Sequence, residues 1–314
     1  MASIFPTRTS VLAVDLTSTG APTAWQRDRD PETESFIMAR LAGLAKLLDR
    51  AGTDLIVTGA PFRLGGRRRR DDYLDGALAL SRLGQHTGSV RLAASIPLAG
   101  NTPTGVASAV ASVHKSTANR GGWQVDAPTP EPARGVEAVT AAWKGRAEAP
   151  AVVVNVRNEV DVEIAAARAT VARLRVDTVE DARNLRSAIR SAATDWGRNP
   201  DDIAVLVDVH AVLASDGQEA ANRAGFIADL DGEQPAGLLQ HAGTVSTFAT
   251  VWQNWVRAGA ADGFTIIPGS IPTDVLAIAT GLLPELDRRG LHAKVDAPVA
   301  AQEPVRTRRQ AIAA

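Results

Sequence analysis

Few side chains in this sequence combine a reactive type with a suggestive position. Asp15, Asp126 and His210 each stand at or just after the end of a short apolar run. Carboxylates and an imidazole in such places could serve as general acids and bases. No motif links the three residues, so acid–base chemistry is one interpretation that stays open.

Several other kinds of site are disfavoured by what the sequence lacks. Without cysteines the chain has no disulfides, no thiolate metal ligands and no cysteine nucleophile. Neither a GxSxG nucleophile motif nor a phosphate-binding P-loop occurs. No HExxH or HxH spacing occurs among the other histidines, so we expect no metal site; these histidines are His86, His114, His241 and His292. Catalytic residues therefore remain unassigned.

A run of four arginines, Arg67–Arg70, is the strongest local concentration of charge. Such a run could bind an anion or a partner. Asp71 and Asp72 follow immediately and partly neutralise the run, so a solvated loop is the favoured interpretation.

Length and charge set broad limits on partners. The chain has 314 residues, a formal net charge of −1 and 45% hydrophobic residues, which suits one large α/β barrel. A nearly neutral chain has no general attraction for nucleic acid or anionic membranes. No apolar run approaches the roughly 20 residues that span a bilayer. We expect a soluble cytoplasmic protein with neither nucleic acid nor membrane as a partner.

Eight short apolar runs recur along the chain, each followed by a longer segment with helical periodicity. Continuous rather than alternating apolarity is typical of strands buried on both faces, and hence of a parallel sheet. The runs are Val11–Leu16, Asp54–Gly59, Val90–Ser95, Gly122–Asp126, Ala151–Val156, Val171–Val176, Ile203–Val209 and Gly263–Ile267.

Helix start and stop signals lie between these runs. Thr102 followed by Pro103 predicts a helix start after the third run, and Asp177 is a plausible N-cap before the helix near 180. Thr244 predicts another start, and Gly259 predicts its end.

Eight strands that alternate with helices can form a closed barrel or an open doubly wound sheet. An open dinucleotide-binding sheet should carry a GxGxxG fingerprint after its first strand, and the stretch DLTSTGAPT does not. We therefore predict a single α/β domain, a (β/α)8 TIM barrel over residues 1–292, in which Gly263–Ile267 closes the barrel against the first strand. Residues 293–314 are rich in Pro, Ala and Arg and predict a flexible tail.

Three segments resemble one family, the bacterial-luciferase-like flavin-dependent monooxygenases, in the branch of the nitrilotriacetate and dibenzothiophene-sulfone enzymes. The most specific is GAADGFTIIPGSIPTDVLAIATGLLPELDRRGL (259–291), which is similar to the closing strand, loop and helix of that branch. Residues 91–128 and 24–59 resemble its third and fourth strands and its opening. Compared with that branch, this chain is divergent, and its fourth loop is shortened.

The resemblance implies a luciferase-like barrel that binds reduced FMN, or the deazaflavin F420, at the carboxyl ends of its strands. Such an enzyme uses dioxygen to oxygenate a small organic substrate. A separate flavin reductase and a homodimer are the partners that the resemblance implies.

The same resemblance implies a set of cofactor-binding positions. Ser95 and Asn101 match polar positions near the flavin, Gln124 replaces an amide, and Trp123 is either a flavin contact or barrel packing. Arg157 and Asn158 fall where the family has a Ser- and Gly-containing phosphate loop at a helix start. Here Glu159 and Asp161 bring negative charge to that place, while Arg157 is either a direct phosphate ligand or a solvated loop residue. The positions are Ser95, Asn101, Trp123, Gln124, Arg157 and Asn158.

Two further interpretations stay open. The long loop that carries substrate contacts in the family is missing after Pro128, and hydroxyls of the fourth strand are lost. These departures favour a flavin-free, catalytically degenerate paralogue that acts as a binding or partner subunit. An unrelated barrel enzyme that uses Asp15, Asp126 and His210 is the other interpretation.

Overall fold

A computed structural model describes residue 5 and residues 9–20, 31–59, 75–126, 131–145, 148–231 and 234–292. For residues 20, 31–37, 75 and 231 it describes the backbone alone. Arg67–Arg70 and the predicted tail, residues 293–314, lie outside the described residues.

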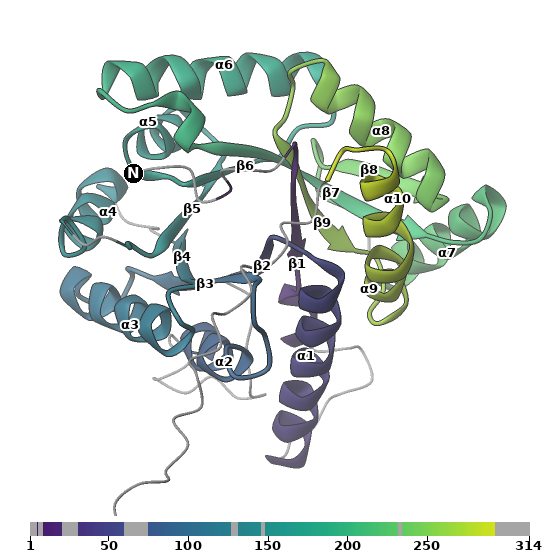
Figure 1. The fold of residues 1–314 in the computed structure, drawn as a ribbon, viewed down its shortest axis with the longest axis horizontal. Helices are drawn as coiled ribbons and strands as arrows, with labels where there is room; N and C mark the ends of the chain where they lie inside the picture. The colour runs from purple at the N-terminus through teal and green to yellow at the C-terminus, as the bar shows by residue number, and fades with distance from the viewer. Residues whose placement is uncertain are drawn as a thin grey trace, which may run out of the picture.

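The strands form a closed parallel barrel (Figure 1). Each strand pairs in parallel with the next barrel strand along the chain, and the last pairs with the first, in the register Val11↔Gly263. The eight barrel strands are β1 (Val11–Asp15), β2 (Leu55–Thr58), β3 (Arg91–Pro97), β4 (Gly121–Asp126), β5 (Ala151–Val156), β6 (Val171–Leu174), β7 (Ala204–Leu213) and β9 (Gly263–Pro268). The predicted (β/α)8 barrel and its closure by the last apolar run are therefore confirmed.

A ninth strand, β8 (Leu239–Gly243), lies outside the closed ring. β7 is ten residues long: its first part pairs with β6, and the stretch from Val209 to Leu213 pairs with β8. The sequence analysis missed β8 because its side chains alternate between half-buried and exposed, with only Gly243 buried, so it lacks the apolar run of a barrel strand.

Helices surround the barrel on its outer side (Figure 1). They are α1 (Pro31–Ala51), α2 (Asp75–Leu83), α3 (Pro103–Ser116), α4 (Pro132–Ala141), α5 (Glu159–Arg168), α6 (Val179–Asp195), α7 (Gly217–Asp231), α8 (Val245–Arg257), α9 (Thr273–Ala277), the π-helical turn η4 (Ile278–Leu282) and α10 (Leu283–Arg288). Two short 3-10 turns, η1 (Thr17–Gly20) and η3 (Pro200–Asp202), complete the connections. No helix in the described ranges is both long and apolar enough to cross a membrane.

The helix signals in the sequence are mostly confirmed. Thr102 and Thr244 are N-caps whose side chains accept hydrogen bonds from Gly105 N and Thr247 N, and Gly259 follows the end of α8 with a positive φ of 67°. The N-cap of α6 is Thr178 rather than Asp177. Thr178 has an extended backbone, and its hydroxyl accepts from Asp181 N at 3.1 Å, which Asp177 is one residue too early to do.

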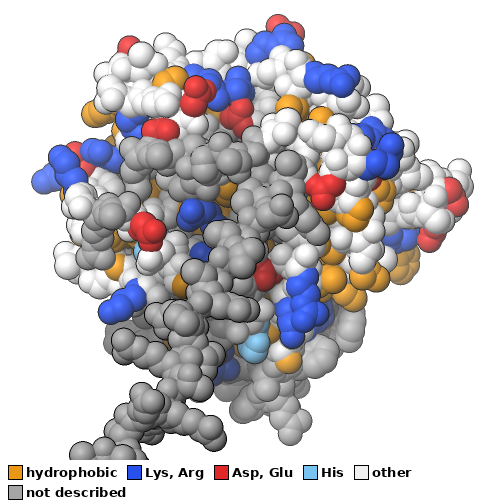
Figure 2. Space-filling model, in the orientation of Figure 1, with side chains coloured by type: hydrophobic (Ala, Val, Ile, Leu, Met, Phe, Trp, Pro, Cys, Tyr) orange, Lys and Arg blue, Asp and Glu red, His pale blue; other side chains and the backbone are white. Residues whose placement is uncertain are grey.

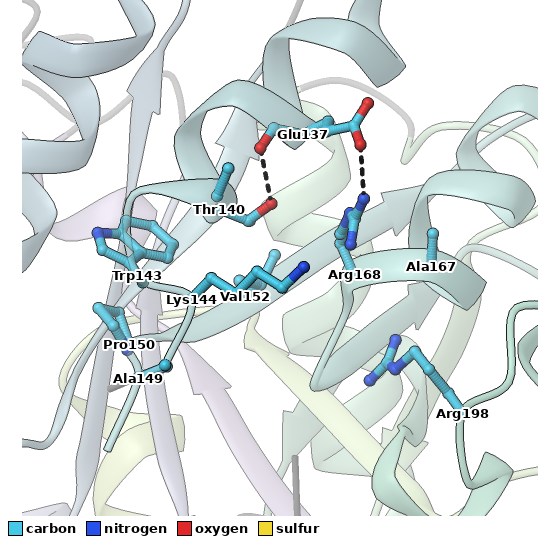
Figure 3. A pocket seen from close by; sticks show the side chains of 12 residues that line it. Glu137, Thr140, Trp143, Lys144, Ala149, Pro150, Val152, Ala167, Arg168 and Arg198 are labelled. Carbon is cyan, nitrogen blue, oxygen red and sulfur yellow. Dashed lines mark hydrogen bonds and ion pairs between the residues drawn. The ribbon is translucent and has the colours of Figure 1, made fainter. Parts of the chain in front are cut away.

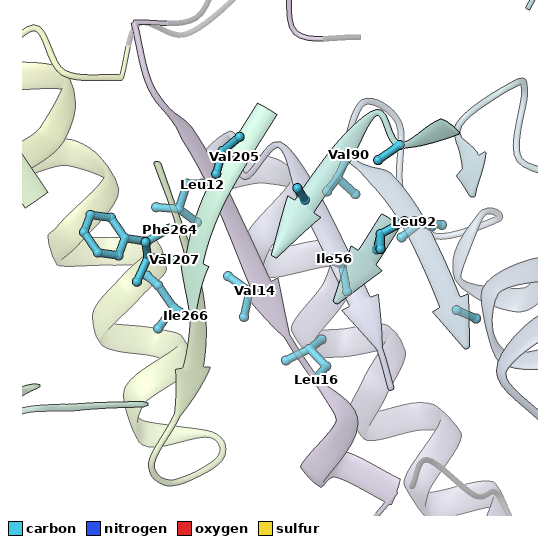
Figure 4. Close-up of a cluster of buried hydrophobic side chains, with 14 of the residues drawn as sticks. Leu12, Val14, Leu16, Ile56, Val90, Leu92, Val205, Val207, Phe264 and Ile266 are labelled. Atoms are coloured by element: carbon cyan, nitrogen blue, oxygen red, sulfur yellow. The ribbon is translucent and has the colours of Figure 1, made fainter. Parts of the chain in front are cut away.

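Alternation along the strands separates two apolar clusters. Side chains facing outward pack under the helices, as Figure 4 shows for Phe264 and Ile266 of β9 and Leu12 of β1. Side chains facing inward form a second, smaller cluster in the lumen: Val11, Ala13, Leu55, Val57, Ala93, Val153, Val171 and Leu206. The lower lumen is thus filled by aliphatic side chains, as the barrel fold requires.

Charges on the surface are mixed in sign. On the face shown in Figure 2, basic and acidic side chains lie among one another over the described residues. This agrees with the nearly balanced composition, 34 Lys and Arg against 35 Asp and Glu.

Closure of the barrel depends on a glycine at the first position of β9. Gly263 has φ 155°, and a Cβ at this position would lie 1.9 Å from the carbonyl oxygen of Val11. We expect Gly263→Ala to lower the free energy of unfolding by about 2–4 kcal/mol, because β1 and β9 must separate to admit the methyl group. Urea unfolding followed by circular dichroism measures this change.

Gly43→Ala is the matched control. Gly43 lies in α1, and a Cβ there would meet nothing within 4 Å. Alanine should leave stability unchanged or raise it by up to about 1 kcal/mol, since it favours helix. Equal destabilisation by the two substitutions would contradict the close approach of β9 to β1.

Candidate functional site

Above the aliphatic layer, toward the carboxyl ends of the strands, the lumen becomes polar. Inward-facing positions repeat every second residue, so Asp15 follows Val11 and Ala13 on β1, and Arg173 follows Val171 on β6. By the same count, Asp208 follows Leu206 on β7. In TIM-barrel enzymes the active site lies at the carboxyl ends of the barrel strands.

Arg173 lies at the centre of this polar layer and joins four strands. Its Nε donates to Asp208 Oδ1 at 2.8 Å, and its Nη2 donates to Asp208 Oδ2 at 3.0 Å and to Asp15 Oδ2 at 2.9 Å. Its Nη1 donates to Gln124 Oε1 of β4 at 2.8 Å. All four side chains are buried, so every bond forms in a poorly screened environment.

The electrostatics of the cluster are unbalanced. Burial disfavours the charge on Arg173, but Asp208 and Asp15 outweigh it and raise the Arg173 pKa. Burial raises the pKa of Asp208, and Asp15 adds to this, while Arg173 opposes it. Two carboxylates thus share one guanidinium, and the layer has an excess of negative charge.

Hydroxyl groups extend the polar layer to the rim. Asp15 Oδ1 accepts from the backbone N–H of Thr17 at 2.9 Å and from the Thr17 hydroxyl, which itself accepts from Gly59 N. Ser95 is buried at the end of β3, and its hydroxyl lies 3.4 Å from Asp126 Oδ2 on β4. The Thr17–Gly59 and Ser95–Asp126 contacts each join neighbouring strands at their carboxyl ends.

The remaining predicted positions at the third and fourth strands lie apart from Arg173. Asn101 donates from Nδ2 to Pro97 O at 2.9 Å and so closes the turn after β3. Trp123 is fully buried and faces outward, where its Nε1 donates to Ile96 O and its ring meets Trp143 edge-on at 6.4 Å. Of the predicted cofactor positions, Gln124 alone contacts the Arg173 cluster.

His210 lies two residues beyond Asp208 on the same face of β7. It borders a pocket of about 260 Å³ between β7, β8 and α7, together with Ile227, Gln234 and Gln240. Asp15 and Asp126 belong to different contacts, with Arg173 and with Ser95, respectively. Of the three acid–base candidates, Asp15 thus belongs to the Arg173 cluster, Asp126 contacts Ser95, and His210 borders the pocket beside β8 and α7.

The start of α5 supplies its own anion. Asn158 is the N-cap, and its Oδ1 accepts from Asp161 N at 3.0 Å. The Asp161 carboxylate accepts from the backbone N–H of Arg157 at 3.0 Å and from its Nε at 3.1 Å. Asp161 N lies in the first turn of α5, where backbone N–H groups would meet a phosphate. The Asp161 carboxylate places negative charge at this helix end and therefore opposes a flavin phosphate there.

Sequence reasoning missed Arg173 and Asp208. Each stands in a strand otherwise made of apolar residues, VARL and AVLVDVHAVL. Ionisable residues inside such runs are expensive to bury unless they pair, and that mismatch was the available signal. The described residues contain no group of three His, Asp or Glu side chains arranged to hold a metal ion.

Neither known family models nor curated proteins match this chain, whereas many solved structures do. EDTA monooxygenase (EmoA) from Chelativorans sp. BNC1 superposes with a TM-score of 0.76 at 15% identity, over 93% of this chain and 96% of that one. The long-chain alkane monooxygenase LadA gives 0.72 at 16% identity, over 93% and 94%. Riboflavin lyase (RcaE), solved with modified FMN and riboflavin, gives 0.72 at 15%, over 92% and 94%.

These likenesses establish the fold. The chain has the same (β/α)8 barrel fold as EDTA monooxygenase and the alkane monooxygenase, over 93% of its length. The sequence resemblance and the structural likeness point to the same group of proteins. At such low identity the reaction and the ligand do not follow from the fold.

The Arg173 cluster predicts a specific stability pattern. Arg173→Met leaves two buried carboxylates without a cation and should lower the free energy of unfolding by about 3–5 kcal/mol at neutral pH. The loss should shrink as the pH falls, because burial raises the pKa of Asp208, which then binds a proton more tightly in the folded state than in the unfolded chain. Urea titrations at about pH 7 and about pH 5 measure both effects.

The control restores neutrality in the same background. Adding Asp15→Asn and Asp208→Asn to Arg173→Met removes the buried charge and should recover most of the loss at about pH 7. A triple variant as unstable as Arg173→Met would show that packing, rather than charge, accounts for the effect.

Proposed function

We propose that this chain is a luciferase-like oxidoreductase, a monooxygenase that uses a reduced flavin or the deazaflavin F420 on a small organic substrate. The observation that carries the proposal is the extent of the fold likeness, which spans 93% of this chain and 96% of an EDTA monooxygenase. The three resembling sequence segments support it independently. Oxygenation itself would be the chemistry of the bound cofactor and dioxygen.

The mouth of the barrel offers polar groups suited to a flat heterocycle. Ser95 and Gln124 lie at the carboxyl ends of adjacent strands, and Asn155 of β5 has a buried Oδ1 without a hydrogen-bond partner among the described residues. Hydroxyl and amide groups can hold the N–H and C=O edges of such a ring. Because Asp161 occupies the start of α5, the proposed cofactor binds without a phosphate contact at that helix.

The proposal also includes two protein partners, a flavin reductase and a second copy of this chain. Reduced flavin would come from a separate reductase, and two copies of the chain would form a dimer in the cytoplasm. Size-exclusion chromatography with light scattering tests the dimer.

One observation favours a second candidate function, a flavin-free paralogue that acts as a binding or partner subunit. Asn158 and Asp161 satisfy the start of α5 internally, and Arg157 is engaged with Asp161 rather than directed to a ligand. A scaffold that no longer binds cofactor would tolerate this arrangement.

Cofactor titration separates the two candidates. Riboflavin, FMN, anaerobically reduced FMN and F420 are each titrated into the purified chain and followed by fluorescence or calorimetry. We expect saturable micromolar binding of at least one, with a Kd of about 1–100 μM. Riboflavin should bind within about threefold of FMN, a difference below 1 kcal/mol, because α5 provides no phosphate site. Absence of binding by all four would leave the flavin-free candidate or an unrelated barrel enzyme.

Arg157→Ala tests the phosphate argument directly. Arg157 is 70% exposed at its side chain and already paired with Asp161, so its loss should change FMN affinity by less than about twofold. A tenfold loss for FMN without a loss for riboflavin would show that Arg157 does hold the phosphate.

A further inference from the structure

A second cavity lies at the opposite end of the barrel from the mouth. It opens between the ends of α4 and α5 and the start of β5, where the strands begin rather than end (Figure 3). Its volume is about 340 Å³, within the lower range of small-molecule pockets. None of the residues discussed for the mouth borders it.

The back wall of the cavity is apolar and firmly held. Trp143 is buried, and its Nε1 donates to Ala107 O of α3 at 3.2 Å, while its ring packs edge-on against Trp123. Pro150 and Val152 continue this wall along the start of β5. A fixed aromatic and aliphatic surface of this kind suits the apolar body of a small ligand.

The rim carries an excess of positive charge. Figure 3 shows the Lys144 side chain extending toward Arg168, whose guanidinium points to Glu137, with the Arg198 side chain below them. Glu137 is the single acidic residue of the lining, and its Oε1 accepts from Arg168 Nη2 at 3.0 Å. Three cations thus face one carboxylate.

The three cations differ in their bonding partners. Arg198 donates to Ala166 O and Ala169 O, both at 2.7 Å, and so caps the carboxyl end of α5. Burial lowers its pKa, and the nearby charge of Arg168 lowers it further, while Asp202 opposes the change. The backbone N–H of Lys144 donates to Ala141 O at 3.1 Å, whereas its side chain makes no hydrogen bond or ion pair with any described residue. Its ammonium is therefore available to bind an anion. At this rim the positive charges of Lys144, Arg168 and Arg198 repel one another.

We propose that this cavity binds a small organic anion, an aromatic or short aliphatic carboxylate. Its apolar body lies against Trp143 and Val152, and its carboxylate meets Lys144 and Arg168 at the rim. Such a site is separate from the proposed cofactor site and does not depend on it. Because it joins α4, α5 and β5, an occupant would stabilise this sector of the barrel.

Calorimetry with a matched pair of probes tests the proposal. Benzoate is titrated into the chain and compared with benzamide, which has the same size and no charge. We expect saturable binding of benzoate with a Kd below about 5 mM and at least tenfold weaker binding of benzamide. Affinity for benzoate should fall as salt is raised. Failure of benzoate to bind, or equal binding of the two probes, would overturn the proposal.

Two charge variants locate the site. Lys144→Gln should weaken benzoate binding by about threefold to tenfold, and Lys144→Arg should retain it. Glu137→Gln removes the competing carboxylate and should strengthen binding by about twofold to fivefold. Unchanged affinity in both Gln variants would show that benzoate binds elsewhere and would refute the assignment.

NMR spectroscopy locates the benzoate site by a second, independent measurement. The indole N–H resonance of Trp143, identified by its disappearance in Trp143→Phe, should shift on adding benzoate and stay in place with benzamide. FMN at saturating concentration should leave this shift unchanged, since the mouth lies at the other end of the barrel. A shift confined to other tryptophans would contradict the site.

Discussion

A closed barrel must fill its own lumen, and this chain fills the upper part with an ion cluster rather than with aliphatic side chains. Arg173 reaches Asp15, Gln124 and Asp208 on three other strands, so the guanidinium acts as a cross-brace. Five N–H donors in a rigid plane suit this task better than a flexible lysine would. These bonds hold the ends of β1, β4, β6 and β7 at a fixed spacing and give the mouth of the barrel a charged floor.

The fold could be predicted well from the sequence, because burial on both faces leaves a strong mark. Eight continuous apolar runs gave the eight barrel strands. β8 escaped because Gln240 and His241 interrupt its apolarity, and its position depends on pairing with the far half of β7. Thr178 replaced Asp177 as the cap of α6 because one residue of backbone geometry decides which side chain reaches Asp181 N.

The site was predictable only in part. Position along the strands predicted that Asp15, Ser95 and Gln124 lie toward the carboxyl ends of the strands, since that follows from the fold. The sequence did not show which of these side chains bond to one another, because Arg173 contacts residues up to 158 positions away along the chain. Asp161 illustrates the same limit: the sequence revealed its charge, and the structure revealed that this charge is already satisfied.

β7 has three strands beside it, and this shared position constrains its register. It pairs with β6 and β9 within the barrel and with β8 beyond it. A slip of one residue would turn every side chain to the opposite face. Asp208 would then enter the apolar layer under the helices, and Val207 would face Arg173. Pairing with β6, β8 and β9 thus fixes the register of β7, and the same register directs Asp208 toward Arg173.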